Sequence, residues 1–277
     1  MGSLISEVLG VPDEQMDKIL GIDDRRNGLC ETHGDFIDRH HSGKGRASEG
    51  WAGCPQCAEE RHQERMREEE YQRQMELMRQ RARRFVAQSG IPKRFSGKSF
   101  DTYRPVNGKS ASILRKIREY SDIVSSGEHA GRSLILLGNV GNGKTHLACA
   151  LLEDVILRTC KPGHYWTFAE LVRDVKASWR KNSEESEQDV YDRFANSELA
   201  ILDEVGMQNF TDFEQTVAYE AVNARYLLEK PTVVITNLPA SELSICLGER
   251  VVDRLRESGG KAFDFDWDSY RSKGAEQ

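Results

Sequence analysis

The feature that most constrains this chain is a glycine-rich motif that follows a short apolar run. Residues 133–137 have the composition of a buried strand, and residues 146–157 have that of a helix. Between them lies the string Gly138-Asn139-Val140-Gly141-Asn142-Gly143-Lys144-Thr145, and His146 opens the helical run. This order of strand, G-x-x-x-x-G-K-[S/T] loop and helix is typical of a phosphate-binding loop. A chance glycine-rich turn is the alternative, and the two flanking elements argue against it.

The chemistry of this loop predicts a bound nucleoside triphosphate. Its glycines allow the backbone to turn several N–H groups toward phosphate oxygens, and the following helix adds the positive end of its dipole. We expect Lys144 to contact the β- and γ-phosphates and Thr145 to ligate Mg²⁺. The predicted cofactors at this site are therefore ATP and Mg²⁺.

Polar side chains follow two further apolar runs. Asp203 and Glu204 come directly after residues 199–202, and Asn237 follows residues 232–236. We expect Asp203 to hold magnesium and Glu204 to act as the base that polarises the attacking water. Asn237 is placed to orient that water against the γ-phosphate. Taken alone, Asp203 could be a helix N-cap and Asn237 a turn residue, but their shared position at strand ends favours one catalytic site.

Short β-rich runs alternate with helical stretches over the second part of the chain. Such alternation predicts βαβ units and a central, mostly parallel sheet with helices on both faces. The fold class is therefore α/β, with a five-stranded sheet, and no internal repeat is visible. The predicted strands are residues 133–137, 164–168, 199–202, 232–236 and 262–265.

Three strings in this part of the chain resemble the DnaC group of replicative helicase loaders, which are AAA+ P-loop ATPases of bacteria and phages. The resemblance covers about residues 90–277, and the last string is its most specific part. The strings are Gly143-Lys144-Thr145-His146-Leu147-Ala148, Leu247-Gly248-Glu249-Arg250-Val251-Val252-Asp253-Arg254-Leu255-Arg256 and Asp266-Trp267-Asp268-Ser269-Tyr270-Arg271-Ser272.

The resemblance implies roles for three arginines. Arg250 and Arg254 lie four positions apart on one predicted helical face, and arginine is well matched to phosphate. Spacing alone favours a solvated charged helix. The family supplies an arginine finger to the neighbouring subunit, so the resemblance makes Arg254 the finger, Arg250 its neighbour and Arg271 a further contact to nucleotide.

The resemblance also implies partners. The family self-associates into an open helical or ring assembly, binds the hexameric replicative helicase of the DnaB type and contacts single-stranded DNA. Here the DNA-facing positions are Trp179 and Phe213, with Lys176 and Arg180 beside them. Aromatic rings stack on any base, and the basic groups can meet phosphates. The alternative is that both rings are ordinary core residues.

Two closely spaced ligand pairs lie in a segment that has almost no aliphatic residues. Cys30 and His33 form the first pair, and Cys54 and Cys57 form the second. Four such ligands suit a structural, tetrahedral Zn²⁺ site, which would supply the folding energy that burial cannot. Free thiols are the alternative, and residues 40–41 offer two competing histidines for the fourth position.

Domain boundaries follow from these features. Residues 1–57 comprise a short apolar helix over residues 4–9 and the zinc module, residues 58–89 a long charged helix, and residues 90–277 the ATPase domain. The long helix carries a narrow apolar seam, which suits a partner helix, and a solvated connecting helix is the alternative. The seam residues are Tyr71, Met75, Met78, Ala82 and Phe85.

Bulk properties limit the remaining choices. No apolar run approaches the roughly 18 residues that cross a bilayer, so we expect a cytoplasmic protein without membrane contact. The net charge of −6 means that DNA must be bound by local patches. A helicase loader is the leading hypothesis, and an IstB-like transposition helper is the alternative. A nucleotide-gated scaffold and a small-molecule kinase are weaker, because a complete catalytic set is present and no substrate lid is evident.

Overall fold

The computed structural model describes residues 13–43, 49–181, 183–206 and 210–269. The chain divides into two compact units, residues 1–76 and residues 77–277. The helix predicted over residues 4–9 and the predicted nucleotide contact Arg271 lie outside the described residues.

The second unit is built on a five-stranded sheet in which every neighbouring pair of strands is parallel. The strand order is β5-β6-β7-β4-β8, so the sheet predicted from the alternation of elements is confirmed. The strands are β4 (Leu134–Gly138), β5 (His164–Thr167), β6 (Ala200–Val205), β7 (Thr232–Thr236) and β8 (Lys261–Phe265).

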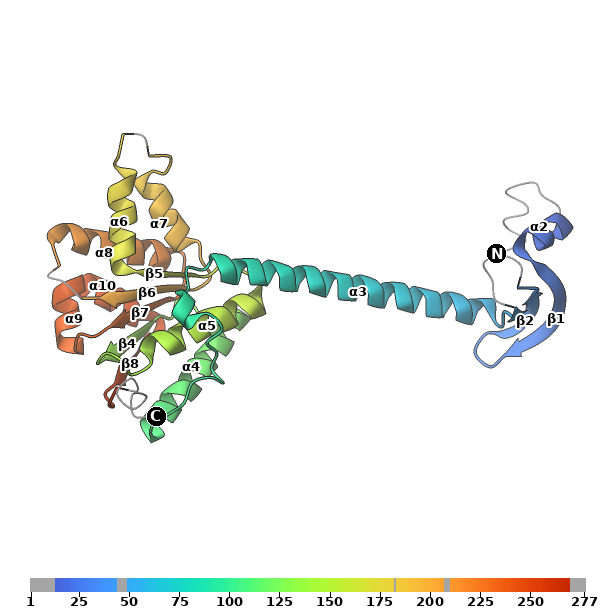
Figure 1. The fold of residues 1–277 in the computed structure, drawn as a ribbon, viewed down its shortest axis with the longest axis horizontal. Coiled ribbons are helices and arrows are strands. Elements are labelled where there is room, and N and C mark those ends of the chain that lie inside the picture. The colour runs from blue at the N-terminus through green and yellow to red at the C-terminus, as the bar shows by residue number, and fades with distance from the viewer. Residues whose placement is uncertain (1–12, 44–48, 182, 207–209, 270–277) are drawn as a thin grey trace. The chain divides into compact units, whose positions relative to one another are not determined.

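Helices cover both faces of this sheet (Figure 1). Successive residues of β4 alternate between the two cores, because strand side chains point to opposite faces. Leu134 and Leu136 belong to the core beneath α4 (Gly108–Ser126) and α5 (Lys144–Thr159), and Ile135 to the opposite core. The helices packed on the opposite core are α6 (Phe168–Ser178), α7 (Glu187–Ala195), α8 (Asp212–Leu227), α9 (Ala240–Leu247) and α10 (Glu249–Arg256).

Side-chain caps define the starts of four helices in this unit, α4, α6, α7 and α8. Thr211 caps α8 by accepting a hydrogen bond from the backbone N–H of Glu214, whose carboxylate accepts from the Thr211 N–H in return. Thr167 and Glu170 make the same reciprocal pair at the start of α6. Each pair satisfies backbone donors that a helix leaves unpaired, and so fixes the residue at which the helix begins.

The first unit has little hydrophobic interior. It contains α2 (Asp13–Leu20) and an antiparallel sheet of β1 (Ile22–Cys30), β2 (Gly34–His41) and β3 (Gly50–Trp51). Among its described residues only Asp38 and Cys54 are buried. The Asp38 carboxylate accepts from the Gly53 N–H at 2.7 Å and from Arg26 Nε at 3.0 Å. Polar contacts and the cysteine cluster therefore hold this unit, because apolar burial is scarce.

The predicted long helix is present as α3 (Pro55–Gln88). The apolar seam packs against the rest of the second unit toward the end of the helix. There Ala82 is buried, and Phe85 packs against the core beneath α4 and α5. Tyr71 and Met78 are exposed. After α3, the Ser89 carbonyl accepts a hydrogen bond from the Tyr165 N–H at 2.7 Å, which joins the chain to strand β5. No helix in the described part of the chain is both long and apolar enough to span a bilayer.

Candidate functional site

The glycine-rich loop opens onto a cavity of about 600 Å³ at the carboxyl ends of the strands. Residues 140–146 form one wall, and Asp203, Glu204 and Asn237 line the same cavity. The predicted loop residues and the predicted acids are thus brought together, although they are far apart in sequence. Ligands of parallel α/β sheets bind at this edge.

Lys144 is held in place by the loop itself. Its Nζ donates to the carbonyls of Gly138 at 2.6 Å and Asn139 at 2.8 Å. Those two carbonyls hold the lysine in position in this structure. Gly138 has a φ of 126°, and an added Cβ there would collide with the Phe265 carbonyl. Burial lowers the pKa of Lys144 to about 8, opposed by the Asp203 carboxylate.

Asp203 and Glu204 face one cavity because β6 contains a bulge. Leu202 pairs with Val234 and Val205 pairs with Thr236, so the two acids together lie opposite the single residue Ile235. Adjacent strand residues normally point to opposite faces, and a bulge re-aims one of them. Glu204 has a φ of 60°, which is the left-handed region. Such backbone strain in a non-glycine residue is concentrated at functional sites.

Three donors fix the Asp203 carboxylate. Oδ2 accepts from Thr145 Oγ1 at 2.9 Å and from the Tyr165 hydroxyl at 2.7 Å, while Oδ1 accepts from the Glu204 N–H at 2.6 Å. Asp203 is buried, and Glu204 is exposed to the cavity. Burial and the charge of Asp203 raise the pKa of Tyr165, so the phenol remains a donor. Sequence reasoning missed Tyr165, because no local pattern marks it.

A segment before α4 completes the cavity and was also missed. Residues 94–106 contribute aromatic and basic groups, and the tail beyond β8 contributes Trp267. Tyr103 packs edge-on against His146 with ring centroids 5.4 Å apart. His146 Nε2 lies 3.2 Å from Thr102 Oγ1, so His146 connects the start of α5 to this segment. The lining residues of this segment are Arg94, Phe95, Lys98, Thr102, Tyr103, Arg104 and Val106.

The loop is also tied to the tail of the unit. Asn142 is buried, and its Nδ2 donates to the carbonyl of Phe265 at 2.6 Å and to that of Trp267. The Asn142 side chain therefore braces the loop at a position that also lines the cavity. This links the most specific string of the sequence, which includes Trp267, to the nucleotide cavity.

The predicted arginines lie on α10 in different surroundings. Arg250 is exposed. Arg254 is half-buried: its guanidinium carbon lies 4.5 Å from the ring centre of Tyr219 and 5.4 Å from that of Tyr226. Its Nη2 donates to the Tyr219 hydroxyl at 3.1 Å. Arg254 is therefore held in one position by aromatic rings, which is a common environment for a guanidinium.

Three of the four candidate DNA-facing residues, Trp179, Phe213 and Lys176, form one surface cluster. The rings of Trp179 and Phe213 lie edge-on with centroids 5.1 Å apart, and Lys176 Nζ lies 5.2 Å from the centre of the Phe213 ring. Trp179 is 58% exposed, whereas Phe213 is partly buried against the core under α6–α10. Trp179 is thus not a core residue. Its Nε1 donates to Glu187 at 2.7 Å, and Lys176 and Arg180 are exposed.

The first unit brings together the four predicted metal ligands. One ligand atom from each of Cys30, His33, Cys54 and Cys57 lies within 4.8 Å of all the others. His33 Nδ1 is 3.6 Å from the Cys30 and Cys54 sulfurs and 3.3 Å from that of Cys57. A zinc tetrahedron with bonds of about 2.0–2.3 Å has edges of roughly 3.5–3.8 Å, so the donor set fits zinc.

The identity of the histidine follows from its neighbours. His33 Nε2 lies 3.0 Å from a carboxylate oxygen of Glu60, which leaves Nδ1 directed at the three sulfurs. A metal-bound histidine usually pairs its second nitrogen with such a carboxylate. His40 instead contacts Asp23, and His41 contacts the Leu20 carbonyl. The two competing histidines therefore lie outside the cluster.

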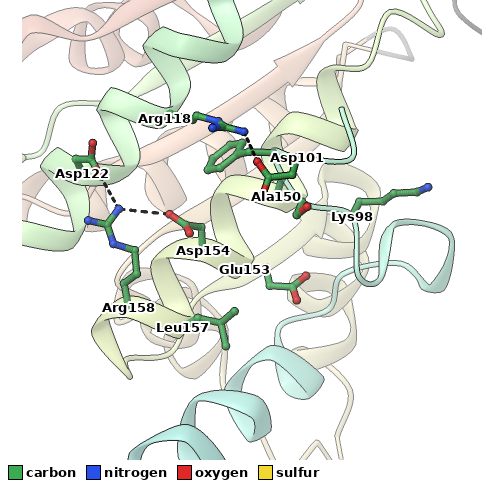
Figure 2. Close-up of a pocket in the computed structure, with 11 residues that line it drawn as sticks. Lys98, Asp101, Arg118, Asp122, Ala150, Glu153, Asp154, Leu157 and Arg158 are labelled. Carbon is green, nitrogen blue, oxygen red and sulfur yellow. Dashed lines mark hydrogen bonds and ion pairs between the residues drawn. The ribbon is translucent and has the colours of Figure 1, made fainter. Parts of the chain in front are cut away.

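A second cavity of about 390 Å³ lies between α4, α5 and residues 98–101 (Figure 2). Its charged side chains largely pair with one another. Arg118 contacts Asp101 at 2.6 Å, and Arg158 contacts Asp122 at 2.7 Å and Asp154 at 3.4 Å. Carboxylates of the same cavity therefore pair with both guanidinium groups.

Comparison with known proteins identifies the family. Residues 57–276 match the family described as IstB-like ATP binding protein. The replicative helicase loader DnaC of Escherichia coli strain K12 is 34% identical over 187 residues, which are 67% of this chain and 74% of that protein. The crystal structure of the DnaC helicase loader shares the fold, with a TM-score of 0.56 and 24% identity over 62% of this chain and 99% of that chain.

A structure of the replication initiator DnaA bound to AMPPCP and single-stranded DNA has the same fold. Its TM-score is 0.53 at 18% identity, covering 64% of this chain and 51% of that chain. The parallel sheet, the glycine-rich loop and the strand-end acids of the second unit are those of an AAA+ domain. The chain is therefore a member of the IstB/DnaC family of ATP-binding proteins.

Proposed function

We propose that this chain is an ATPase that binds a hexameric replicative helicase and single-stranded DNA and delivers the helicase onto the DNA. The observation that carries the proposal is the convergence of Lys144, Thr145, Asp203 and Glu204 on one cavity, in a chain that is 34% identical to a replicative helicase loader. The similarity to a helicase loader indicates a replicative helicase as the partner, and the cavity suits ATP as the energy source.

The cavity residues divide the work of hydrolysis. Lys144 neutralises the β- and γ-phosphates, and the backbone of residues 138–143 surrounds them. Thr145 and Asp203 would hold Mg²⁺, which would supply positive charge to offset the negative charge that develops on the phosphates. Glu204 accepts a proton from the attacking water, and Asn237 orients that water. The contacts that support these roles are the Thr145–Asp203 hydrogen bond and the position of Glu204 at the bulge.

Arg254 acts in the neighbouring subunit of an assembly, with Arg250 beside it. Its fixed position against Tyr219 supports this role, because a finger that is already ordered loses little entropy when it meets phosphate. A complementation experiment tests it. Lys144→Ala and Arg254→Ala chains are each inactive, but mixing them restores turnover at interfaces that combine one intact lysine with one intact arginine. No recovery on mixing would place Arg254 outside the active site.

Trp179, Phe213, Lys176 and Arg180 form the contact to single-stranded DNA. An exposed indole beside a second ring provides a platform on which any base can stack. Two exposed cations near the rings can meet the phosphates. This cluster suits binding without sequence preference, which is what loading at varied DNA sites requires.

Zn²⁺ held by Cys30, His33, Cys54 and Cys57 stabilises the first unit. The four ligand atoms are already close together, and the described part of the unit buries only two residues. The metal would supply structure rather than catalysis, because the chain offers four side-chain ligands and a tetrahedral zinc needs no more.

A loading assay on closed circular single-stranded DNA tests the proposal. A ring-shaped helicase cannot thread onto a closed circle unless the ring opens, so helicase recovered with the circle measures loading directly. Loading should require this chain and ATP, and it should be lost with Lys144→Ala. Helicase recovery that does not depend on the chain would refute the proposal.

A transposition helper is the second candidate, because the matching family carries the name IstB-like ATP binding protein. In that case the partner is a transposase, which the ATPase deposits on DNA. Parallel binding measurements with a purified replicative helicase and a purified transposase, each with and without ATP, separate the two candidates.

A further inference from the structure

Tyr165 lies beside the acid that we assign to magnesium. It belongs to β5, which pairs in parallel with β6, and its side chain is 6% exposed. The hydroxyl donates to Asp203 Oδ2 at 2.7 Å. This is the shorter of the two hydrogen bonds to that oxygen, because Thr145 Oγ1 donates to it at 2.9 Å.

Both ends of Tyr165 are fixed. Its backbone N–H donates to the Ser89 carbonyl at 2.7 Å, and its ring packs in the core beneath α4 and α5. The phenol therefore approaches Asp203 from a neighbouring strand with little freedom to move. A hydrogen bond from a rigid group restricts the rotation of the carboxylate that accepts it.

The two donors to Oδ2 differ once the nucleotide site is filled. The proposed function makes the Thr145 hydroxyl a magnesium ligand, so that hydroxyl would serve the metal as well as donate to Asp203. Tyr165 is not a proposed metal ligand. Within the described residues, the hydrogen bond of its hydroxyl goes to Asp203. The phenol is thus a donor that orients Asp203 from outside the set of proposed metal ligands.

We propose that Tyr165 is a positioning residue that sets the Mg²⁺ affinity of the nucleotide site by orienting Asp203. The inference rests on the proposed function and adds to it a residue outside the phosphate loop and the strand-end acids. Loss of such an outer contact typically weakens metal binding by about 10- to 100-fold.

A magnesium titration of nucleotide binding tests this role without relying on turnover. The full chain is mixed with a fluorescent ATP analogue, and bound fluorescence is followed as MgCl₂ is added. In Tyr165→Phe the half-saturating Mg²⁺ concentration should rise by at least about 10-fold. Binding of the analogue in EDTA should stay within about twofold of the wild type, because the phenol does not contact the loop that surrounds the phosphates.

Tyr120→Phe is the matched control. It also removes a buried tyrosine hydroxyl, which donates to the Arg132 carbonyl at 2.7 Å, and it lies outside the residues that line the nucleotide cavity. Its magnesium titration should match the wild type. In an Asp203→Asn background, Tyr165→Phe should cause no further loss, since the group that it positions is already changed.

The outcomes separate the two proposals. If the wild-type chain binds the analogue but Tyr165→Phe shows an unchanged or tighter Mg²⁺ dependence, the role of Tyr165 is overturned and the ATPase assignment stands. An equal shift in Tyr120→Phe also overturns that role, because the effect is then general to lost buried hydroxyls. If the wild-type chain does not bind the analogue at any Mg²⁺ concentration, both proposals fail.

Discussion

Replacement of Trp179 by alanine gives the sharpest test of the DNA-binding surface. The indole is 58% exposed and lies edge-on to the Phe213 ring. Its removal should therefore weaken DNA binding more than it lowers the stability of the fold. Base stacking on an aromatic side chain contributes about 1–3 kcal/mol, which corresponds to roughly 5- to 150-fold in affinity. The buried part of the ring limits the cost to folding to roughly 2 kcal/mol.

The assay is fluorescence anisotropy of a labelled oligothymidine in the presence of a non-hydrolysable ATP analogue. Trp179→Ala should lower the affinity by about 10-fold or more, and Trp179→Phe should fall between it and the wild type. Tyr71→Ala is the matched control, because Tyr71 is a 55% exposed aromatic residue of α3 and is not one of the candidate DNA-facing residues. Equal affinities for Trp179→Ala and wild type, within about twofold, would remove Trp179 from the DNA-binding surface.

Three further predictions concern hydrolysis, metal binding and acid stability. Glu204→Gln should keep ATP bound but lower turnover by at least about 100-fold in a phosphate-release assay, and near-normal turnover would show that another group is the base. Cys54→Ser should reduce the zinc content, measured by mass spectrometry, from about one ion per chain to a small fraction; metal retained in full would contradict the ligand set. Burial alone would raise the pKa of Glu198, but hydrogen bonds from Lys161 and Lys230 lower it below its usual value. Its stabilising contribution is therefore present above the unfolded pKa of about 4.3 and is lost as the pH falls through the folded value, so Glu198→Gln should flatten the acid side of a stability–pH curve.

The sheet and the centre of the site were accessible from sequence because their signals are local. The loop ending in Lys144 and Thr145 combines a spacing with two flanking elements, and Asp203 and Asn237 each follow an apolar run. Parallel strands bring their carboxyl ends to one edge, so residues at strand ends predict a shared site without knowledge of the strand order. The first metal pair, Cys30 and His33, is local in the same sense.

The remaining site residues depend on which strands are neighbours and on details of the backbone. Tyr165 reaches Asp203 only because β5 pairs with β6, and alternation of apolar residues does not reveal that pairing. The bulge that turns Glu204 toward the cavity also has no sequence pattern of its own. Residues 94–106 line the cavity but contain no motif. The choice of His33 over two other histidines required the contacts of each ring, because only the His33 ring faces the sulfurs.

The hydrogen bond between Ser89 and Tyr165 covers part of an exposed edge of the sheet. Strand β5 is an outer strand of the sheet, and outer strands expose backbone groups that can template pairing with another chain and lead to aggregation. Ser89, which follows α3, accepts a hydrogen bond from one of these backbone groups, the Tyr165 N–H. Gly90, with a φ of 76°, allows the close approach, because a Cβ there would lie 2.5 Å from the Tyr165 carbonyl oxygen. A side chain at position 90 would therefore displace the segment after α3 and expose the backbone of β5. That exposed strand could then pair with another chain and cause aggregation, in a unit that we propose assembles with copies of itself.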